Sequence, residues 1–308
     1  MPFLDLGQTA LELGLISSLT VLALFLSYSM LNVCDLSTDG CFTLGATVGA
    51  VVALSGHPYL AIAAAMGAGV LSGLITAVLQ TKLGVDSLLS GIIVNTALYS
   101  VNIAVMGGAS LLNMNKTDTV FTRMASLLAH TPFARQSKLA VALIAVAAVS
   151  VLLALFLRTR LGLAIRAPGN NPDMVRSSSI NPAFTTIVGL CAANAVTGLS
   201  GCLLAQAQKS VNIDIGTGMV TIALASLLIG NAFAGKSRSI PLRIGGAVLG
   251  AVIFRLVYTV ALRFHMPAFM LKLVSAVIVV LAIAEPYLKG QLPTLRRRLS
   301  HRGGRGAV

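Results

Sequence analysis

Nine runs of apolar residues, separated by short polar breaks, constrain most strongly how this chain can fold. The runs lie at 11–31, 41–55, 58–79, 87–108, 138–157, 183–206, 218–234, 240–262 and 267–285. About 20 apolar residues let a helix cross a bilayer, where helices and closed barrels alone satisfy their backbone hydrogen bonds. Only 10% of the residues are charged, against about 25% in soluble domains. The sequence therefore predicts an all-α, polytopic transmembrane bundle of about eight to ten spans.

One of these spans is predicted to be discontinuous. The run at 41–55 is short, and it follows the polar, glycine-containing stretch Asp35–Gly40 (DLSTDG). A short apolar segment behind a polar break is typical of the broken helices found in transporters. We predict one transmembrane domain over 1–290, followed by a basic tail over 291–308.

The distribution of Lys and Arg predicts which loops face the cytoplasm. If the spans alternate, the segments 80–86, 158–182, 235–243 and the tail from 286 share one side and carry 14 basic residues. The opposite loops at 109–138, 207–217 and 263–266 carry six. Because cytoplasmic loops are enriched in Lys and Arg, the first side, including the C-terminus, is predicted to be cytoplasmic. The N-terminus then lies outside, unless one span is a re-entrant half-helix.

This asymmetry also explains the net charge of +13. Aromatic residues make up only 5% of the chain, so the stacking platforms of nucleic-acid-binding proteins are missing from the sequence. We expect a membrane lipid environment and no nucleic-acid partner.

Polar residues inside the apolar runs are the candidate functional residues, because a polar group in hydrocarbon is costly. Asn95, Tyr99 and Asn102 are spaced four and three apart, so they share one face of a helix. Asn194 lies in the sixth run, and the helix break adds four more polar residues. The predicted substrate pathway is Asp35, Ser37, Thr38, Asp39, Asn95, Tyr99, Asn102 and Asn194. Hydrogen bonding between helices is the alternative role for these residues.

Three pairs of glycines recur four residues apart, which places both members on one helix face. The pairs are Gly45/Gly49, Gly69/Gly73 and Gly246/Gly250. Small residues at this spacing let the backbones of membrane helices approach closely, so we predict that these glycines pack helices together.

Catalytic motifs are missing from the sequence, and the one motif that matches, a phosphate-loop pattern, lies in the wrong structural context. Residues 230–237 (GNAFAGKS) fit the phosphate-loop pattern, but that loop requires a preceding strand and a following helix. Here an apolar span precedes the motif and Pro241 follows it. The histidines have no Cys, Asp or Glu at metal-ligand spacing. We predict no enzymatic activity, no metal and no cofactor.

The segment 158–182 is predicted to form a structured cytoplasmic loop. Four Arg residues mark it as cytoplasmic, and Pro168–Asn171 (PGNN) predicts a turn. Pro172 suits the first position of a short helix with Asn171 as its cap. Such a helix, held between two spans, would offer a docking surface to a partner.

This segment also resembles a known family. It is similar to the stretch LG-x-A-x-R-A-x-G-x-N-P-x-M of permease subunits of ATP-binding-cassette (ABC) importers, in the superfamily of branched-chain amino-acid and ribose permeases. Residues 35–45 (DLSTDGCFTLG) resemble a signature of the group associated with tryptophan or tyrosine uptake, and 88–92 and 97–102 resemble its fourth span. The resemblance covers about residues 11–285. The chain departs from it at Pro168–Asn171, where relatives commonly have TGDN, and at Asn231, where they often have an acid.

The resemblance implies partners and a mechanism. It implies separate ATPase subunits, an extracytoplasmic substrate-binding protein and a second permease copy forming a homodimer in the plasma membrane. ATP hydrolysis would then drive alternating access through the segment 158–182. The residues expected to couple to the ATPase are Leu161, Gly162, Arg166, Asn170, Asn171 and Met174.

Two other functions stay open on the sequence alone. An ion-coupled secondary transporter usually carries acids deep in its spans, and here Asp35 and Asp39 in the break are the only candidates. A membrane scaffold without transport activity is the third possibility. The expected cargo of an importer is a small polar solute, such as an amino acid.

Overall fold

The computed structural model describes residues 3–127, 136–170, 181–234 and 239–263, together with six isolated positions between 273 and 284. The helices are α1 (Phe3–Leu24), the π-helix η1 (Phe25–Met30), α2 (Thr38–Leu54), α3 (Pro58–Thr81), α4 (Ser87–Val105), α5 (Val120–Leu127), α6 (Ser137–Phe156), α7 (Arg160–Asn170), α9 (Pro182–Gln208), α10 (Met219–Ala234) and α11 (Ile240–Arg263). The described residues also contain two short strands, β1 (Leu111–Asn113) and β2 (Ser210–Asn212).

The predicted helical membrane bundle is confirmed. Eight of the nine apolar runs coincide with helices, and the ninth, 267–285, lies almost entirely outside the described residues. Six helices among the described residues are long and apolar enough to cross a membrane, and α2 and α10 are shorter apolar helices.

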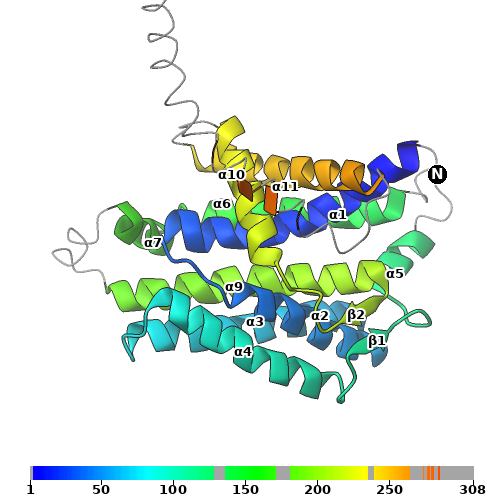
Figure 1. Ribbon diagram of the computed structural model, residues 1–308, viewed down its shortest axis with the longest axis horizontal. Helices are drawn as coiled ribbons and strands as arrows, with labels where there is room; N and C mark the ends of the chain where they lie inside the picture. Colours follow the sequence, from blue (N-terminus) through cyan, green and yellow to red (C-terminus); the bar gives the residue numbers. More distant parts are fainter. Residues whose placement is uncertain are drawn as a thin grey trace, which may run out of the picture.

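The two ends of the bundle are easily distinguished (Figure 1). The α7 helix and the α3–α4 connection lie at one end. At the other end lie α5 and an antiparallel ribbon, in which Leu111 of β1 pairs with Asn212 of β2. The described parts of the loops 109–138 and 207–217 therefore share one end, as the alternating spans predicted. The ribbon itself and α5 were not predicted, because three-residue strands and an eight-residue helix leave little periodic signal.

The predicted discontinuous helix is present, and a second one accompanies it. After η1, residues 31–37 cross part of the bundle without regular helix, and α2 then begins at Thr38. The stretch 213–218 likewise separates β2 from α10. The Asp39 carboxylate of α2 accepts hydrogen bonds from the backbone N–H groups of Gly218 (2.9 Å) and Val220 (2.8 Å). Both half-helices therefore start at the same level inside the bundle.

The predicted glycine pairs do pack helices. A Cβ on Gly45 would overlap the backbone of Gly198 in α9, and one on Gly69 would overlap the carbonyl oxygen of Asn194. A Cβ on Gly250 would likewise overlap the carbonyl of Ser226. Only glycine lets the backbones of α2, α3 and α9, and those of α10 and α11, approach this closely.

Gly230, the first residue of the phosphate-loop pattern, is also a helix-packing glycine. A Cβ on Gly230 would overlap the carbonyl oxygen of Gly246, so this glycine serves the contact between α10 and α11. The motif is helical as far as Ala234, and its last three residues lie outside the described ones.

The turn predicted at Pro168–Asn171 is wrong as far as the structure describes it. Helix α7 starts at Arg160 and continues through Pro168 to Asn170. The fully buried Ile165 anchors α7, and tertiary packing of this kind outweighs one residue's low helix propensity. Since Pro168 lies in the last turn, the helix loses only one backbone hydrogen bond there. The predicted cap Asn171, the helix from Pro172 and Met174 lie outside the described residues.

Candidate functional site

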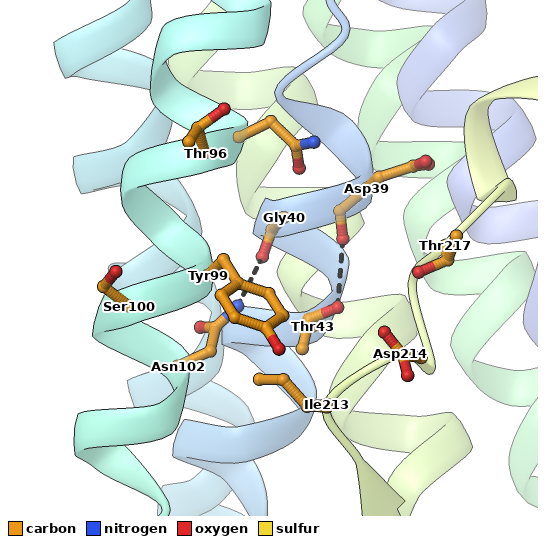
Figure 2. A pocket seen from close by; sticks show the side chains of 11 residues that line it. Asp39, Gly40, Thr43, Thr96, Tyr99, Ser100, Asn102, Ile213, Asp214 and Thr217 are labelled. Atoms are coloured by element: carbon orange, nitrogen blue, oxygen red, sulfur yellow. Dashed lines mark hydrogen bonds between the residues drawn. The ribbon is translucent and has the colours of Figure 1, made fainter. Parts of the chain in front are cut away.

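A cavity of about 400 Å³ lies where the two half-helices meet. Its walls come from α4 on one side, the β2–α10 connection on the other, and the start of α2 between them (Figure 2). The lining residues are Asp39, Gly40, Thr43, Asn95, Thr96, Tyr99, Ser100, Asn102, Ile213, Asp214 and Thr217. This volume is within the range of small-molecule sites.

Helix α4 contributes the wall that the sequence predicted. Asp86 caps α4 by accepting a hydrogen bond from Leu88 N–H (2.9 Å), and the helix then presents Asn95, Tyr99 and Asn102 on one face. The Asn102 Nδ2 donates to the carbonyl oxygen of Gly40 (3.2 Å), which ties α4 to the start of α2. Because Tyr99 and Asn102 lie in the second half of α4, the cavity lies toward the β-ribbon end of the bundle.

Asp39 connects the two half-helices at the cavity. Each of its carboxylate oxygens accepts one backbone hydrogen bond from the first residues of α10 or the residue just before them. A negative charge at a helix N-terminus is favourable, because the first backbone N–H groups have no partner within the helix. Asp39 therefore fixes the position of α10 beside the cavity that it lines.

The other polar residues of the break form a buried network behind the cavity. The Asp35 carboxylate accepts hydrogen bonds from Ser37 N–H (2.8 Å), Ser37 Oγ (2.6 Å) and Asn194 Nδ2 (2.7 Å). Thr76 of α3 donates to Ser37 Oγ (3.2 Å), and Thr38 Oγ1 donates to the Asp35 carbonyl (2.9 Å). Asp35 and Asn194 are each only 1% exposed.

The eight predicted pathway residues thus divide into two groups. Asp39, Asn95, Tyr99 and Asn102 line the cavity, whereas Asp35, Ser37, Thr38 and Asn194 do not. Hydrogen bonds between segments are made by Asn194 with Asp35 and by Thr76 with Ser37. The lining residue Asn102 also makes one, with Gly40.

Sequence reasoning missed several lining residues that carry a readable signal. Thr96 and Ser100 lie one position from Asn95 and Tyr99 on α4. Asp214 and Thr217 stand in a polar, glycine-containing stretch before a short apolar run, the same pattern that marked the break at 35–40. Thr43 lies one helical turn after Asp39, and its Oγ1 donates to the Asp39 carbonyl (3.1 Å).

Four of the six predicted coupling residues lie on α7, at the end of the bundle opposite the ribbon. Leu161 is 43% exposed and Arg166 is half-buried. Gly162 is buried, and a Cβ there would overlap the Phe156 carbonyl and the Leu157 backbone. Glycine is therefore needed where the first turn of α7 packs against the end of α6. Asn170 is the last helical residue, and Asn171 and Met174 lie outside the described residues.

Comparison with known proteins extends these findings. Residues 8–283 match the model of a protein family described as the permease component of branched-chain amino acid transport systems. A tyrosine transport system permease protein of Clostridioides difficile is 30% identical over 287 residues, which cover 93% of each chain. The ribose import permease of Escherichia coli K12 is 26% identical over 221 residues, covering 70% of this chain and 67% of the relative.

No solved structure matches the chain. The family match nevertheless spans nearly all of the described helices, from α1 to α11, and includes both half-helices and the cavity between them. The chain therefore belongs to the family of transport permeases described as the permease component of branched-chain amino acid transport systems.

Proposed function

We propose that the chain is the membrane permease subunit of an ABC importer that moves a small polar solute, such as an amino acid, across the plasma membrane. The observation that carries this proposal is the polar cavity at the meeting point of two half-helices, in a chain of a transport permease family. Broken helices place backbone ends and polar side chains at mid-membrane depth, where they can bind solute and change position.

The proposed complex contains other subunits. Two copies of the permease pair with two ATPase subunits at the α7 end, and an extracytoplasmic binding protein delivers the solute at the ribbon end. The C-terminus is then cytoplasmic, together with the tail from 291. The relatives named for tyrosine and ribose transport support a small polar solute as cargo.

Transport requires no covalent chemistry from this chain. In the proposed mechanism, closure of the ATPase subunits displaces α7 and the adjoining ends of α6 and α9. Movement of α9 reaches the half-helices, because α9 packs on α2 through Gly198 and binds Asp35 through Asn194. The cavity would then be exposed to one side of the membrane at a time.

The coupling role of α7 has a direct test. In the assembled complex, Leu161→Asp and Arg166→Glu should reduce solute-stimulated ATP hydrolysis at least about tenfold, because a new or reversed charge at a protein–protein contact disrupts docking. Leu83→Asp, in the α3–α4 connection and 68% exposed, lies at the same end of the bundle but outside α7; it is the matched control and should leave stimulation unchanged. Each variant must elute like the parent chain on size exclusion. Undiminished stimulation in both α7 variants would contradict the coupling role.

The cavity's place on the pathway has a separate test. Single cysteines replacing Asn95 and Tyr99 should change their rate of thiol labelling severalfold between the nucleotide-free and ATP-bound complexes. Ser55→Cys, exposed at the end of α2 and outside the cavity lining, should label at one rate in both states. If cavity and control positions respond alike, the cavity is not a gated pathway.

The same complex distinguishes the ion-coupled alternative. Solute uptake by proteoliposomes that contain the permease and its ATPase should require ATP and should not respond to an imposed proton or sodium gradient. Uptake driven by such a gradient without ATP would favour a secondary transporter.

A further inference from the structure

The charges that line the cavity are all of one sign. Asp39 and Asp214 are its ionisable acidic residues, and neither Lys, Arg nor His is among the lining residues. In a confined site of lowered dielectric, an excess of one charge acts strongly on any charged solute.

The two carboxylates differ in how far the protein already compensates them. Asp39 accepts two backbone hydrogen bonds from the start of α10, whose helix dipole offsets part of its charge. Asp214 is exposed, and no residue in the described part of the chain donates a hydrogen bond to its carboxylate. Asp214 is therefore the group with the most capacity to bind a cation in the cavity.

Asn102 adds an unsatisfied acceptor at the cavity wall. This residue is 1% exposed, and its Nδ2 must face the Gly40 carbonyl, because that oxygen can only accept a hydrogen bond. The Asn102 Oδ1 is then left without a donor among the described residues. A buried acceptor without a partner is unfavourable, so a group that brings N–H donors would improve this site.

The hydroxyl groups of two lining threonines already donate their hydrogen atoms to backbone carbonyls. Thr43 Oγ1 donates to the Asp39 carbonyl, and Thr96 Oγ1 donates to the Ile92 carbonyl (2.9 Å). Toward the cavity these oxygens can therefore only accept. The exposed ring of Tyr99 adds a π-face of the kind that attracts cations.

We propose that the cavity binds its solute through a positively charged ammonium group, held by Asp214 with Asp39 and the neighbouring acceptors, and that it excludes solutes of net negative charge. This inference rests on the proposed function, since it names the chemical class of the solute at the same site. An ammonium group supplies three donors and no acceptor, which complements the acceptor-rich lining. A carboxylate in the same place would meet two like charges and few donors.

The test uses the purified full chain in lipid nanodiscs and needs neither the ATPase nor the binding protein. The half-buried Cys34 and Cys191 are replaced by Ala, while Cys41 and Cys202 are fully buried and stay. Ser100→Cys then places one reactive thiol in the cavity wall, and Ser55→Cys, exposed at the end of α2, is the matched control.

Charged thiol reagents measure the local potential. Trimethylammonioethyl methanethiosulfonate is cationic, and sulfonatoethyl methanethiosulfonate is anionic and similar in size. We expect the ratio of cationic to anionic labelling rates to be about tenfold higher at Ser100→Cys than at Ser55→Cys. Asp214→Asn should reduce that excess severalfold, and Asp214→Glu should restore it. Asp214 is suited to this test because its exposed carboxylate holds no described part of the fold.

Small probes test binding itself. Millimolar ethanolammonium should slow labelling at Ser100→Cys, whereas glycolate and glycerol, of similar size, should not. Asp214→Asn should abolish the protection. Equal labelling ratios at the two positions, or protection by glycolate or glycerol as strong as that by ethanolammonium, would overturn the inference.

Failure of the inference and failure of the proposed function give different results. Protection by ethanolammonium without any nucleotide response at Asn95 and Tyr99 would support the cation site while rejecting the gated pathway. A nucleotide response at Asn95 and Tyr99 with no preference for cations would support the gated pathway while rejecting the cation site.

Discussion

Replacing Gly69 by alanine should destabilise the protein by about 1–3 kcal/mol, the usual effect of forcing extra volume into a packed interface. The added Cβ would overlap the Asn194 carbonyl oxygen and would approach Ala195 Cα to 3.2 Å. Both contacts are with backbone, which cannot rotate away, so α3 and α9 would have to separate along their whole interface.

The same helix supplies the control. A Cβ on Gly67, two residues earlier on α3, would meet nothing within 4 Å. Gly67→Ala should therefore leave the stability unchanged or raise it by about 0.5–1 kcal/mol, because alanine has the higher helix propensity. Thermal unfolding of the detergent-solubilised variants measures both effects. Equal unfolding temperatures for the two variants would show that α3 and α9 are not in backbone contact at Gly69.

Replacing Asp35 by alanine should cause the largest loss of stability, about 3–5 kcal/mol, because several buried hydrogen-bond donors lose their acceptor at once. The change leaves the Asn194 Nδ2, the Ser37 Oγ and the Ser37 N–H without their acceptor. Each buried donor without a partner costs about 1–3 kcal/mol, and little water reaches a site that is 1% exposed. Asp35→Asn should be intermediate, since its amide keeps one acceptor oxygen but turns an NH₂ toward a donor.

Asp86→Ala is the matched control for Asp35. Asp86 also precedes a helix and also accepts a hydrogen bond from the N–H two residues ahead, but it is exposed. Water can replace the lost acceptor there, so we expect Asp86→Ala to lower the free energy of unfolding by about 1 kcal/mol, the usual effect of losing a helix cap. Unfolding of the two variants in the same detergent makes the comparison. Similar losses would mean that the Asp35 network contributes only as a local cap.

Much of this architecture was predictable from the sequence because each span satisfies its backbone hydrogen bonds by itself. The local apolar pattern therefore located the long apolar helices to within a few residues, apart from the start of α1, whereas α5 was missed and α7 stands where a turn was predicted. The polar break at 35–40 predicted the first half-helix. The second break, at 213–218, was missed because the apolar run behind it was read as an ordinary span. Its polar residues Asp214 and Thr217 carried the same signal as the first break.

The candidate site was only partly predictable, as Asp35 and Asp39 illustrate. The two acids lie four residues apart in one polar break, and both were assigned to the solute pathway. In the structure Asp35 is buried against Asn194, whereas Asp39 caps α10 and lines the cavity. The two acids differ because of their hydrogen-bond partners, which lie more than 150 residues further along the chain. A local sequence pattern carries no information about such distant contacts.

The sequence by itself determined that this chain is a bundle of membrane helices, one of them broken, because the cost of exposing polar groups to lipid acts on each segment separately. It also placed the β-ribbon loops together at one end, since alternating spans leave no other arrangement. Only the tertiary structure decided which polar residues hold helices together and which face the cavity. That choice depends on which backbones come into contact, and the contacts at Gly69, Gly45 and Asp39 are made with α9 and α10, far away in the sequence.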